Sequence, residues 1–148
     1  MKKVGIMSMQ RIANYGSFLQ AYALKQLLEE LGHKVEFVDY HVGAPVIAEN
    51  ADSKNKFVRK LEKGLETFRY QAPPSHKFSF IRYKQSFAKK YMPLLGITDE
   101  MNYNPTLDSL VIGSDEVFNC IQKNSNVGYS TELLGKDNHA DRVITYAA

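Results

Sequence analysis

The sequence has 148 residues, of which 44% are hydrophobic and 24% charged, with a formal net charge of +3. That length is enough for one domain with a real core, and the apolar content excludes an intrinsically disordered chain. The single cysteine, Cys120, excludes an intramolecular disulfide framework and a cysteine-based zinc site, so we expect a reducing, cytoplasmic location. No apolar run approaches the roughly 20 residues of a membrane span, and Gln10 and Arg11 come too early for a secretion signal.

The charge is distributed unevenly along the chain. Residues 54–90 contain eleven Lys and Arg and two acidic residues, a local charge of +9, whereas the remainder has 8 basic and 14 acidic residues, a net charge of −6. A solvated pair of basic helices explains such a segment without any function, and a surface for an anionic partner explains it equally well. The sequence alone leaves both interpretations open.

The first 40 residues have the pattern of a strand, a helix and a second strand. Residues 3–8 are apolar with little alternation, which is typical of a buried strand. After a loop over residues 9–16, apolar side chains recur at helical spacing over residues 17–31, and Gly32 follows where a helix end favours a left-handed residue. Residues 35–40 alternate as a strand, so we predict a βαβ unit and the start of a parallel sheet.

Two basic amphipathic helices are predicted in the middle of the chain. Residues 50–70 have apolar side chains at a spacing of three to four, and a pair of prolines ends this pattern. We expect Ser75 to cap a second helix that runs to about residue 91 and that Pro93 ends. Two helices joined by a proline-rich turn indicate an insertion at about residues 50–92 rather than a separate domain.

Three kinds of anionic partner suit this basic segment: a nucleic acid, a membrane surface with anionic lipids, and a phosphorylated substrate. Aromatic side chains between Lys and Arg are able to stack on bases, but here they recur at helical spacing, so we expect most of them to be core or interface residues. We therefore predict no nucleic-acid partner, and we regard peripheral contact with an anionic membrane as at least as good a match.

The last third of the chain returns to the α/β pattern. Residues 107–112 are predicted to form a strand that leads into a glycine-containing loop, and residues 142–146 another core strand two residues before the chain ends. Such an ending indicates a truncated protein. Together the elements predict an α/β fold: a Rossmann-like parallel sheet with helices on both faces and a basic helical insertion.

Two loops are candidate binding sites, because ligands of open α/β sheets lie beyond the carboxyl ends of the strands. In the first loop Asn14 or Ser17 caps the following helix, whose N–H groups and positive dipole end favour an anion or polar ligand, and Gly16 allows close backbone approach. A plain capped turn explains the same residues. Asp39 stands where a ribose-binding acid would, but the G-x-G-x-x-G fingerprint is absent, which disfavours a flavodoxin-like nucleotide-binding protein.

The second loop contains Gly113, Ser114 and Asp115, with Asn119 shortly after it. A carboxylate in this place is able to transfer protons or to hydrogen-bond hydroxyl groups, although Ser114 or Asp115 would equally serve as the N-cap of a helix. The four histidines have no metal-ligand spacing and Cys120 has no evident catalytic partner. We therefore predict no metal site and no nucleophilic triad.

Seven segments of the sequence, taken together, suggest a family. They are VGIM at 4–7, NYGSFLQAYAL at 14–24, LGH at 31–33, VDY at 38–40, the aromatic and basic stretch at 80–91, VIGSDEVFN at 111–119 and ITYAA at 144–148. In their order and spacing they resemble the N-terminal half of the polysaccharide pyruvyl transferase family, and the resemblance covers nearly the whole chain. Two positions depart from the family pattern, which usually has Gln and Trp where this chain has Glu116 and Phe118.

The resemblance implies a protein of two facing Rossmann-like domains, as in B-type glycosyltransferases, well over twice the length of this chain. It places most of the basic residues that hold the donor in a C-terminal domain. Residues 1–148 then correspond to the N-terminal domain, the donor-binding domain is absent, and we expect the isolated chain to be inactive.

The implied activity is the transfer of pyruvate from phosphoenolpyruvate to a saccharide as a ketal, in surface polysaccharide synthesis. The donor is protonated at its methylene carbon, a sugar hydroxyl attacks C2, phosphate leaves, and a second hydroxyl closes the ring. This chemistry needs a carboxylate near the hydroxyls and cationic groups near the phosphate. Asp115 is the candidate acid/base residue. The candidate substrate-binding residues are Asn14, Tyr15, Gly16, Ser17, Gln20, Gly113, Ser114 and Asn119.

The expected partners are phosphoenolpyruvate as a co-substrate, with no bound cofactor, and a saccharide acceptor, which in bacteria is often lipid-linked. A lipid-linked acceptor gives the basic helices a reason to dock at the inner face of an anionic membrane. Exposed apolar surface on half of a protein also favours a homo-oligomer. The alternative function is a non-catalytic α/β module that binds anionic lipid or a partner subunit through residues 54–90.

Overall fold

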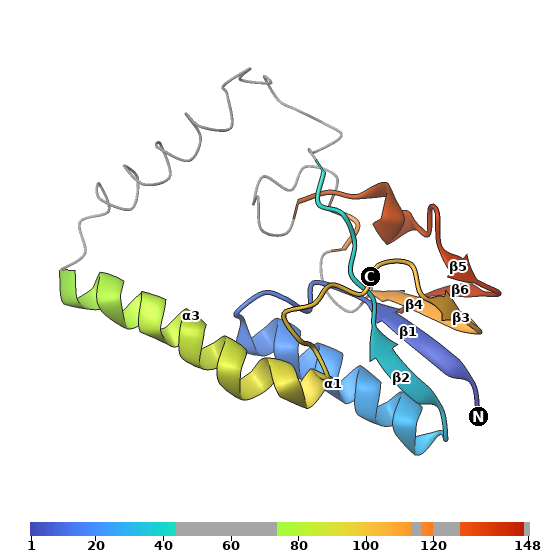
Figure 1. Cartoon of the computed structure of the whole chain (residues 1–148), viewed down its shortest axis with the longest axis horizontal. Helices are drawn as coiled ribbons and strands as arrows, with labels where there is room; N and C mark the ends of the chain where they lie inside the picture. The colour runs from blue at the N-terminus through green and yellow to red at the C-terminus, as the bar shows by residue number, and fades with distance from the viewer. Residues whose placement is uncertain (44–73, 114–116, 120–127, 147–148) are drawn as a thin grey trace.

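The computed structural model describes residues 1–43, 74–113, 117–119 and 128–146, and it has an α/β fold (Figure 1). Its main sheet is parallel throughout, with the strand order β2–β1–β4–β6. The strands are β1 Lys3–Met7, β2 Lys34–Phe37, β4 Ser109–Gly113 and β6 Val143–Tyr146, and the helices are α1 Tyr15–Glu30 and α3 Pro74–Leu95. This arrangement confirms the predicted α/β class with a parallel, Rossmann-like sheet. The predicted helix at 50–70 lies outside the described residues.

The predicted βαβ unit is confirmed as β1, α1 and β2. Val4 and Ile6 are buried on the face of the sheet that the helices cover and Met7 is buried on the opposite face, and this burial on both faces explains the nearly continuous apolar run of β1. The helix begins two residues earlier than predicted, because Asn14 is its N-cap: the Asn14 Oδ1 accepts hydrogen bonds from the N–H groups of Gly16 (2.7 Å) and Ser17 (3.4 Å). Gly32 has a φ of +81°, the left-handed conformation expected after the helix.

The two predictions for the ends of α3 are wrong. The helix starts at Pro74, since proline suits the first helical position, so Ser75 lies inside the helix and does not cap it. Pro93 does not end the helix, which continues to Leu95. The end is instead formed by hydrogen bonds from the Gly96 N–H to the Pro93 carbonyl (3.0 Å) and from the Ile97 N–H to the Met92 carbonyl (3.1 Å).

The strand predicted at 107–112 is split in two at Asp108. The side chain of Asp108 accepts a hydrogen bond from the Lys3 N–H (2.6 Å), and the Asp108 N–H donates to the Lys3 carbonyl (2.9 Å). These two bonds hold Asp108 beside the first residue of β1, and β4 begins directly after it. The preceding residues form β3 (Thr106–Leu107), which pairs in parallel with β5 (His139–Ala140) in a small second sheet.

Both described helices cover one face of the main sheet, although helices on both faces were predicted. Side chains of α1 and α3 form a single core with the alternate residues of the strands; its buried members are Val4, Ile6, Phe18, Ala21, Leu24, Phe37, Phe87, Leu95, Ile97 and Val111. The opposite face packs against Leu107 of β3 and Leu133 of the short 3₁₀ helix η1 (Thr131–Leu134). Among the described residues, η1 is therefore the only helical element of that second face.

An aromatic cluster joins α1 to α3. Phe18 packs against Phe87 and Tyr91 with ring centroids 6.1 and 5.2 Å apart, and Tyr15 contacts the same two rings at 5.2 and 5.4 Å. The N-terminal half of α3 extends beyond the end of α1 and away from the sheet (Figure 1). Neither α1 nor α3 is long and apolar enough to cross a membrane.

Candidate functional site

The loops that follow the strands gather at the carboxyl edge of the sheet. Residues 8–14 follow β1, residues 38–41 follow β2, and Gly113 ends β4. The first loop brings the predicted residues Asn14, Gly16 and Ser17 together at the start of α1 through the Asn14 cap. The capped turn is thus present, and its presence leaves open whether the same residues also bind a ligand.

The predicted binding residues of α1 differ in exposure. Asn14, Gly16 and Gln20 are exposed and Ser17 is half-buried, so this end of the helix is open to solvent. Tyr15 is also exposed, but its ring lies against Tyr83 and the rest of the aromatic cluster, and a hydrogen bond to the Tyr91 hydroxyl raises its pKa. The structure thus places Tyr15 in the α1–α3 interface rather than with Asn14 and Gln20.

The second loop is described only at its two ends. Gly113 has a φ of +130°, which favours glycine, and pairs in register with Tyr146 of β6. Asn119 is half-buried beside the buried Val117. Ser114 and Asp115 lie outside the described residues, so the acid/base role of Asp115 stays a prediction.

Asp39, which is buried, forms an ion pair with the more exposed Arg11. The Arg11 Nε and the second guanidinium nitrogen donate to the two carboxylate oxygens at 2.6 and 2.7 Å, and the Asn102 N–H adds a bond of 2.9 Å. Burial alone would raise the pKa of Asp39, but the bonds from Arg11, Asn102 and Gln10 outweigh it and lower the pKa. The same carboxylate raises the pKa of Arg11. Asp39 is therefore a structural residue and has little capacity left for a ribose.

This Arg11–Asp39 pair ties residues 96–102 to the sheet. The guanidinium also donates to the carbonyl oxygens of Thr98 (2.8 Å) and Glu100 (3.1 Å), while Asn102 Nδ2 donates to the Phe37 carbonyl (2.8 Å). The charge of Arg11 is thus balanced by Asp39, and its N–H groups already donate to Asp39, Thr98 and Glu100. It is consequently a poor candidate to bind the phosphate of a donor.

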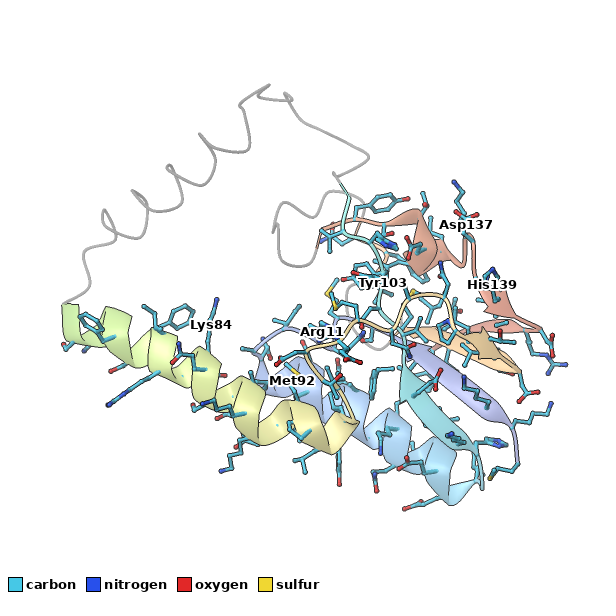
Figure 2. The ribbon with its side chains drawn as sticks, viewed as in Figure 1. Arg11, Lys84, Met92, Tyr103, Asp137 and His139 are labelled. Atoms are coloured by element: carbon cyan, nitrogen blue, oxygen red, sulfur yellow. The ribbon has the colours of Figure 1, made fainter. Side chains whose placement is uncertain are left out.

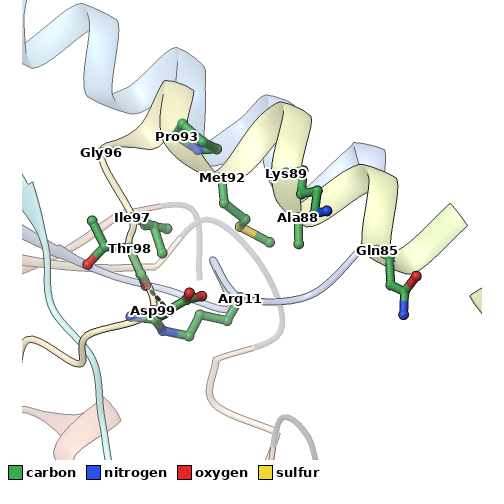
Figure 3. Close-up of a pocket in the computed structure, with 10 residues that line it drawn as sticks. All are labelled: Arg11, Gln85, Ala88, Lys89, Met92, Pro93, Gly96, Ile97, Thr98 and Asp99. Atoms are coloured by element: carbon green, nitrogen blue, oxygen red, sulfur yellow. Dashed lines mark hydrogen bonds between the residues drawn. The ribbon is translucent and has the colours of Figure 1, made fainter. Parts of the chain in front are cut away.

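A groove of about 780 Å³ lies between α3 and the segment that Arg11 holds (Figure 3). Ala88, Met92 and Ile97 give it apolar walls, and Lys89 and Gln85 add polar groups on the α3 side. This groove was not predicted from the sequence, because it forms only where Arg11 meets residues 85–99, which are more than 70 residues away along the chain.

His41 and Glu132, which were not predicted as site residues, are 91 residues apart and contact each other beyond the end of β2. No spacing signal connects them, since only the fold brings η1 to β2. Within the described part of the chain, no three His, Cys, Asp or Glu side chains gather in a way that would hold a metal ion.

Comparison with known proteins gives no match: no family model, no curated protein and no solved structure is significantly similar to this chain.

Proposed function

We propose that this chain is the N-terminal, acceptor-binding domain of a polysaccharide pyruvyl transferase, which transfers pyruvate from phosphoenolpyruvate to a saccharide as a ketal in surface polysaccharide synthesis. The observation that supports this most is the placement of residues 14–20. They belong to the longest segment of the family resemblance, and they form the exposed start of α1 at the carboxyl edge of a parallel sheet. That is where an α/β protein binds its ligand.

The chemistry available at this edge suits an uncharged polyol. Asn14 and Gln20 have amide groups, which donate and accept hydrogen bonds as sugar hydroxyls do. Arg11, the cation in the first loop, is engaged with Asp39 and two carbonyl groups. The proposal therefore assigns the saccharide to this domain and the phosphate of phosphoenolpyruvate to a second Rossmann-like domain, with the transferase cytoplasmic and active only when both are present.

Saccharide binding by the chain itself tests this assignment. Oligosaccharides with a free 1,2- or 1,3-diol on the terminal hexose are titrated into labelled protein, and the amide resonances of α1 are followed by NMR. We expect shifts at residues 14–20 and a Gln20→Ala variant that binds about fivefold more weakly, as for the loss of one hydrogen bond. Gln26→Ala, at the other end of the same helix, is the matched control. Absence of binding by every diol, or equal affinity of Gln20→Ala and wild type, contradicts the proposal.

Asn14 needs separate treatment because it also caps the helix. Asn14→Ala is expected to cost about 1 kcal/mol of stability through the lost cap alone. Asn14→Asp retains the capping oxygen but lacks the amide donors. Weaker saccharide binding by Asn14→Asp, with unchanged thermal unfolding, distinguishes a ligand contact from a purely structural cap.

A second function, docking of α3 on an anionic membrane, is favoured by the exposed end of this helix. Phe78 and Ile81 are 72% and 54% exposed, and Arg82 follows them on the same helical stripe. The helix has no acidic residue. Such a surface inserts apolar side chains between lipid headgroups while its cations contact anionic lipid.

Flotation with vesicles of phosphatidylglycerol and phosphatidylcholine tests the membrane proposal. We expect the protein to float with these vesicles at low salt and not with phosphatidylcholine alone, and we expect Phe78→Ser combined with Ile81→Ser to abolish flotation. Leu27→Ser, an exposed leucine of α1, is the control. Binding that is indifferent to anionic lipid and to salt would exclude this mode.

A further inference from the structure

His41 and Glu132 form a carboxylate–imidazole pair beyond the end of β2. The Nδ1 atom of His41 lies 2.8 Å from Oε1 of Glu132, and the backbone N–H of His41 donates to Oε2 of the same carboxylate at 3.3 Å. The two carboxylate oxygens of Glu132 therefore contact the same residue, one at the backbone N–H of His41 and the other at its imidazole ring. This double contact fixes the position of the imidazole with respect to the chain.

The two partners differ strongly in exposure. The side chain of Glu132 is 14% exposed, whereas that of His41 is 62% exposed. A carboxylate that is largely removed from water needs hydrogen-bond donors, and His41 supplies two of them. The opposite side of the imidazole faces solvent.

A third side chain fixes the plane of the imidazole. The ring of Tyr103, labelled in Figure 2, stacks on that of His41 with centroids 4.0 Å apart and planes inclined by 12°. Glu132 is itself held in place, because its N–H donates to the Ser130 Oγ that caps η1. Two separate segments, at Tyr103 and at residues 130–132, thus orient one exposed histidine.

This geometry selects one tautomer of the neutral ring. When Nδ1–H donates to the carboxylate, Nε2 keeps its lone pair and becomes the proton acceptor. Among the described residues, none forms a hydrogen bond with Nε2 of His41. The same relation between carboxylate and imidazole makes histidine a general base in hydrolases, where the carboxylate also stabilises the imidazolium that forms.

We propose that His41 is the general base for the acceptor hydroxyl, with Glu132 and Tyr103 as positioning residues. The inference rests on the proposed transferase function. His41 follows β2 and residues 14–20 follow the adjacent β1, so both lie at the carboxyl edge of the sheet. The O–H bond of the saccharide breaks and its proton moves to Nε2, while the oxygen electron pair forms a bond to C2 of the enolpyruvyl donor. The π bond between C2 and the methylene carbon breaks, and its electron pair binds one proton from solvent to give a methyl group. Phosphate then leaves C2 with the electron pair of its C–O bond as the second hydroxyl closes the ketal, and His41 returns its proton to solvent.

The first test is the reactivity of the imidazole in the chain as it stands. Diethyl pyrocarbonate is added at about pH 8, where free imidazoles are neutral, and the modification rate of each histidine is followed by mass spectrometry. We expect His41 to react several-fold faster than His76, an exposed histidine of α3. Glu132→Gln is expected to slow the modification of His41 about tenfold. The amide of glutamine is able to donate a hydrogen bond to Nδ1, which favours the tautomer whose proton is on Nε2 and which therefore has no lone pair there to react.

The matched control is Asp137→Asn, which removes one exposed carboxylate at a residue with φ of +56° that asparagine tolerates. It should leave the rate at His41 unchanged. Equal rates for His41 and His76, or a Glu132→Gln variant that unfolds like the wild type and reacts as fast, overturn the proposal.

The second test connects His41 to the acceptor. A diol-bearing oligosaccharide that binds the chain should protect His41 from diethyl pyrocarbonate and leave His139 reactive, and His41→Gln should weaken binding of this oligosaccharide about fivefold. Binding without protection of His41 overturns the base role alone and leaves the acceptor-binding function intact. Absence of any saccharide binding overturns both proposals.

Discussion

At the scale of single residues, the Arg11–Asp39 pair explains how the carboxyl edge of the sheet is held together. The carboxylate of Asp39 is 6% exposed and receives hydrogen bonds from Arg11, Gln10 and the Asn102 N–H. Through these bonds one buried charge connects the ends of β1 and β2 to the segment that follows α3. Removal of one partner leaves the other charge without compensation, which costs more than the intact pair contributes.

We predict that Arg11→Met lowers the free energy of unfolding by about 2–4 kcal/mol, because it leaves the Asp39 carboxylate buried and unpaired. The double variant Arg11→Met with Asp39→Leu should be more stable than Arg11→Met alone. Urea unfolding followed by tyrosine fluorescence measures this, since the chain has nine tyrosines and no tryptophan. A double variant that is less stable than both single variants would contradict this account.

The lowered pKa of Asp39 predicts an acid-dependent part of the stability. The pKa is lower in the folded than in the unfolded chain, so the stabilisation is complete above the unfolded-state pKa of about 4 and is lost as the pH falls through the folded-state value. The stability difference between wild type and Asp39→Asn should therefore shrink as the pH falls below about 5. Asp137→Asn, which removes an exposed carboxylate, is measured in the same way as the control.

Asn14 and Asp39 show what a sequence reveals about single residues. Asn14 or Ser17 was predicted as the helix cap, and the structure shows that Asn14 is the cap, with partners only two and three residues away. The partner of Asp39 is 28 residues away, and the partner of His41 is 91 residues away. Local spacing has no information about such contacts, which is why the ion pair and the carboxylate–imidazole pair were not predicted.

At the scale of elements, β1 is the strand on which the others assemble. It lies between β2 and β4, and Gly5 is its middle residue. A Cβ atom at Gly5 would lie 2.5 Å from Cδ1 of Leu107 and 2.8 Å from Cγ2 of Val38. Glycine is therefore needed here because β3 crosses close above the sheet, and the sequence gives no sign of this requirement.

We predict that Gly5→Ala destabilises the protein by about 1–3 kcal/mol through overpacking. A second substitution, Leu107→Ala, opens space at the contact, so the loss caused by Gly5→Ala should be smaller in the Leu107→Ala background than in the wild type. Thermal unfolding of the wild type, the two single variants and the double variant gives the coupling free energy between the two positions. Additive effects would mean that Gly5 and Leu107 do not meet as described.

The ends of α3 illustrate the limits of element prediction. Apolar spacing correctly predicted the helix, whereas the two prolines were assigned the wrong roles. Pro74 starts the helix instead of preceding it, and Pro93 lies in the last turn, where the hydrogen bonds to Pro93 and Met92 carbonyls form the end. The spacing of side chains determines that a helix forms, while its ends depend on a few backbone bonds that the spacing does not encode.

At the scale of the whole molecule, the sheet is covered unevenly. β1 and β4 are buried, whereas every residue of β6 is exposed. The apolar pattern of 142–146 predicted a core strand, and the structure confirms the strand but not its burial. The apolar composition of β6 shows that the strand is suited to pack against other apolar residues, but it does not show whether such residues are present. Among the described residues, none forms a layer over β6.

Because the sheet is covered unevenly, we predict that truncation to alanine lowers the free energy of unfolding by different amounts at two neighbouring apolar residues on one face. Val111 of β4 and Ile144 of β6 are register partners, but Val111 is 7% exposed and Ile144 is 44% exposed. Val111→Ala should cost about 2–3 kcal/mol through the cavity that it leaves. Ile144→Ala removes more atoms and should nevertheless cost less than about 1 kcal/mol, because its side chain already contacts water.

Urea unfolding at two protein concentrations distinguishes this account from a homo-oligomer that covers β6. In the single chain the cost of Ile144→Ala is small and independent of concentration. If a second copy buries Ile144, the wild type gains stability with concentration, and the variant loses that gain. A large, concentration-dependent cost of Ile144→Ala would therefore contradict the exposed edge and show that β6 pairs or packs with another chain, whereas the cost of Val111→Ala should remain the same at both concentrations.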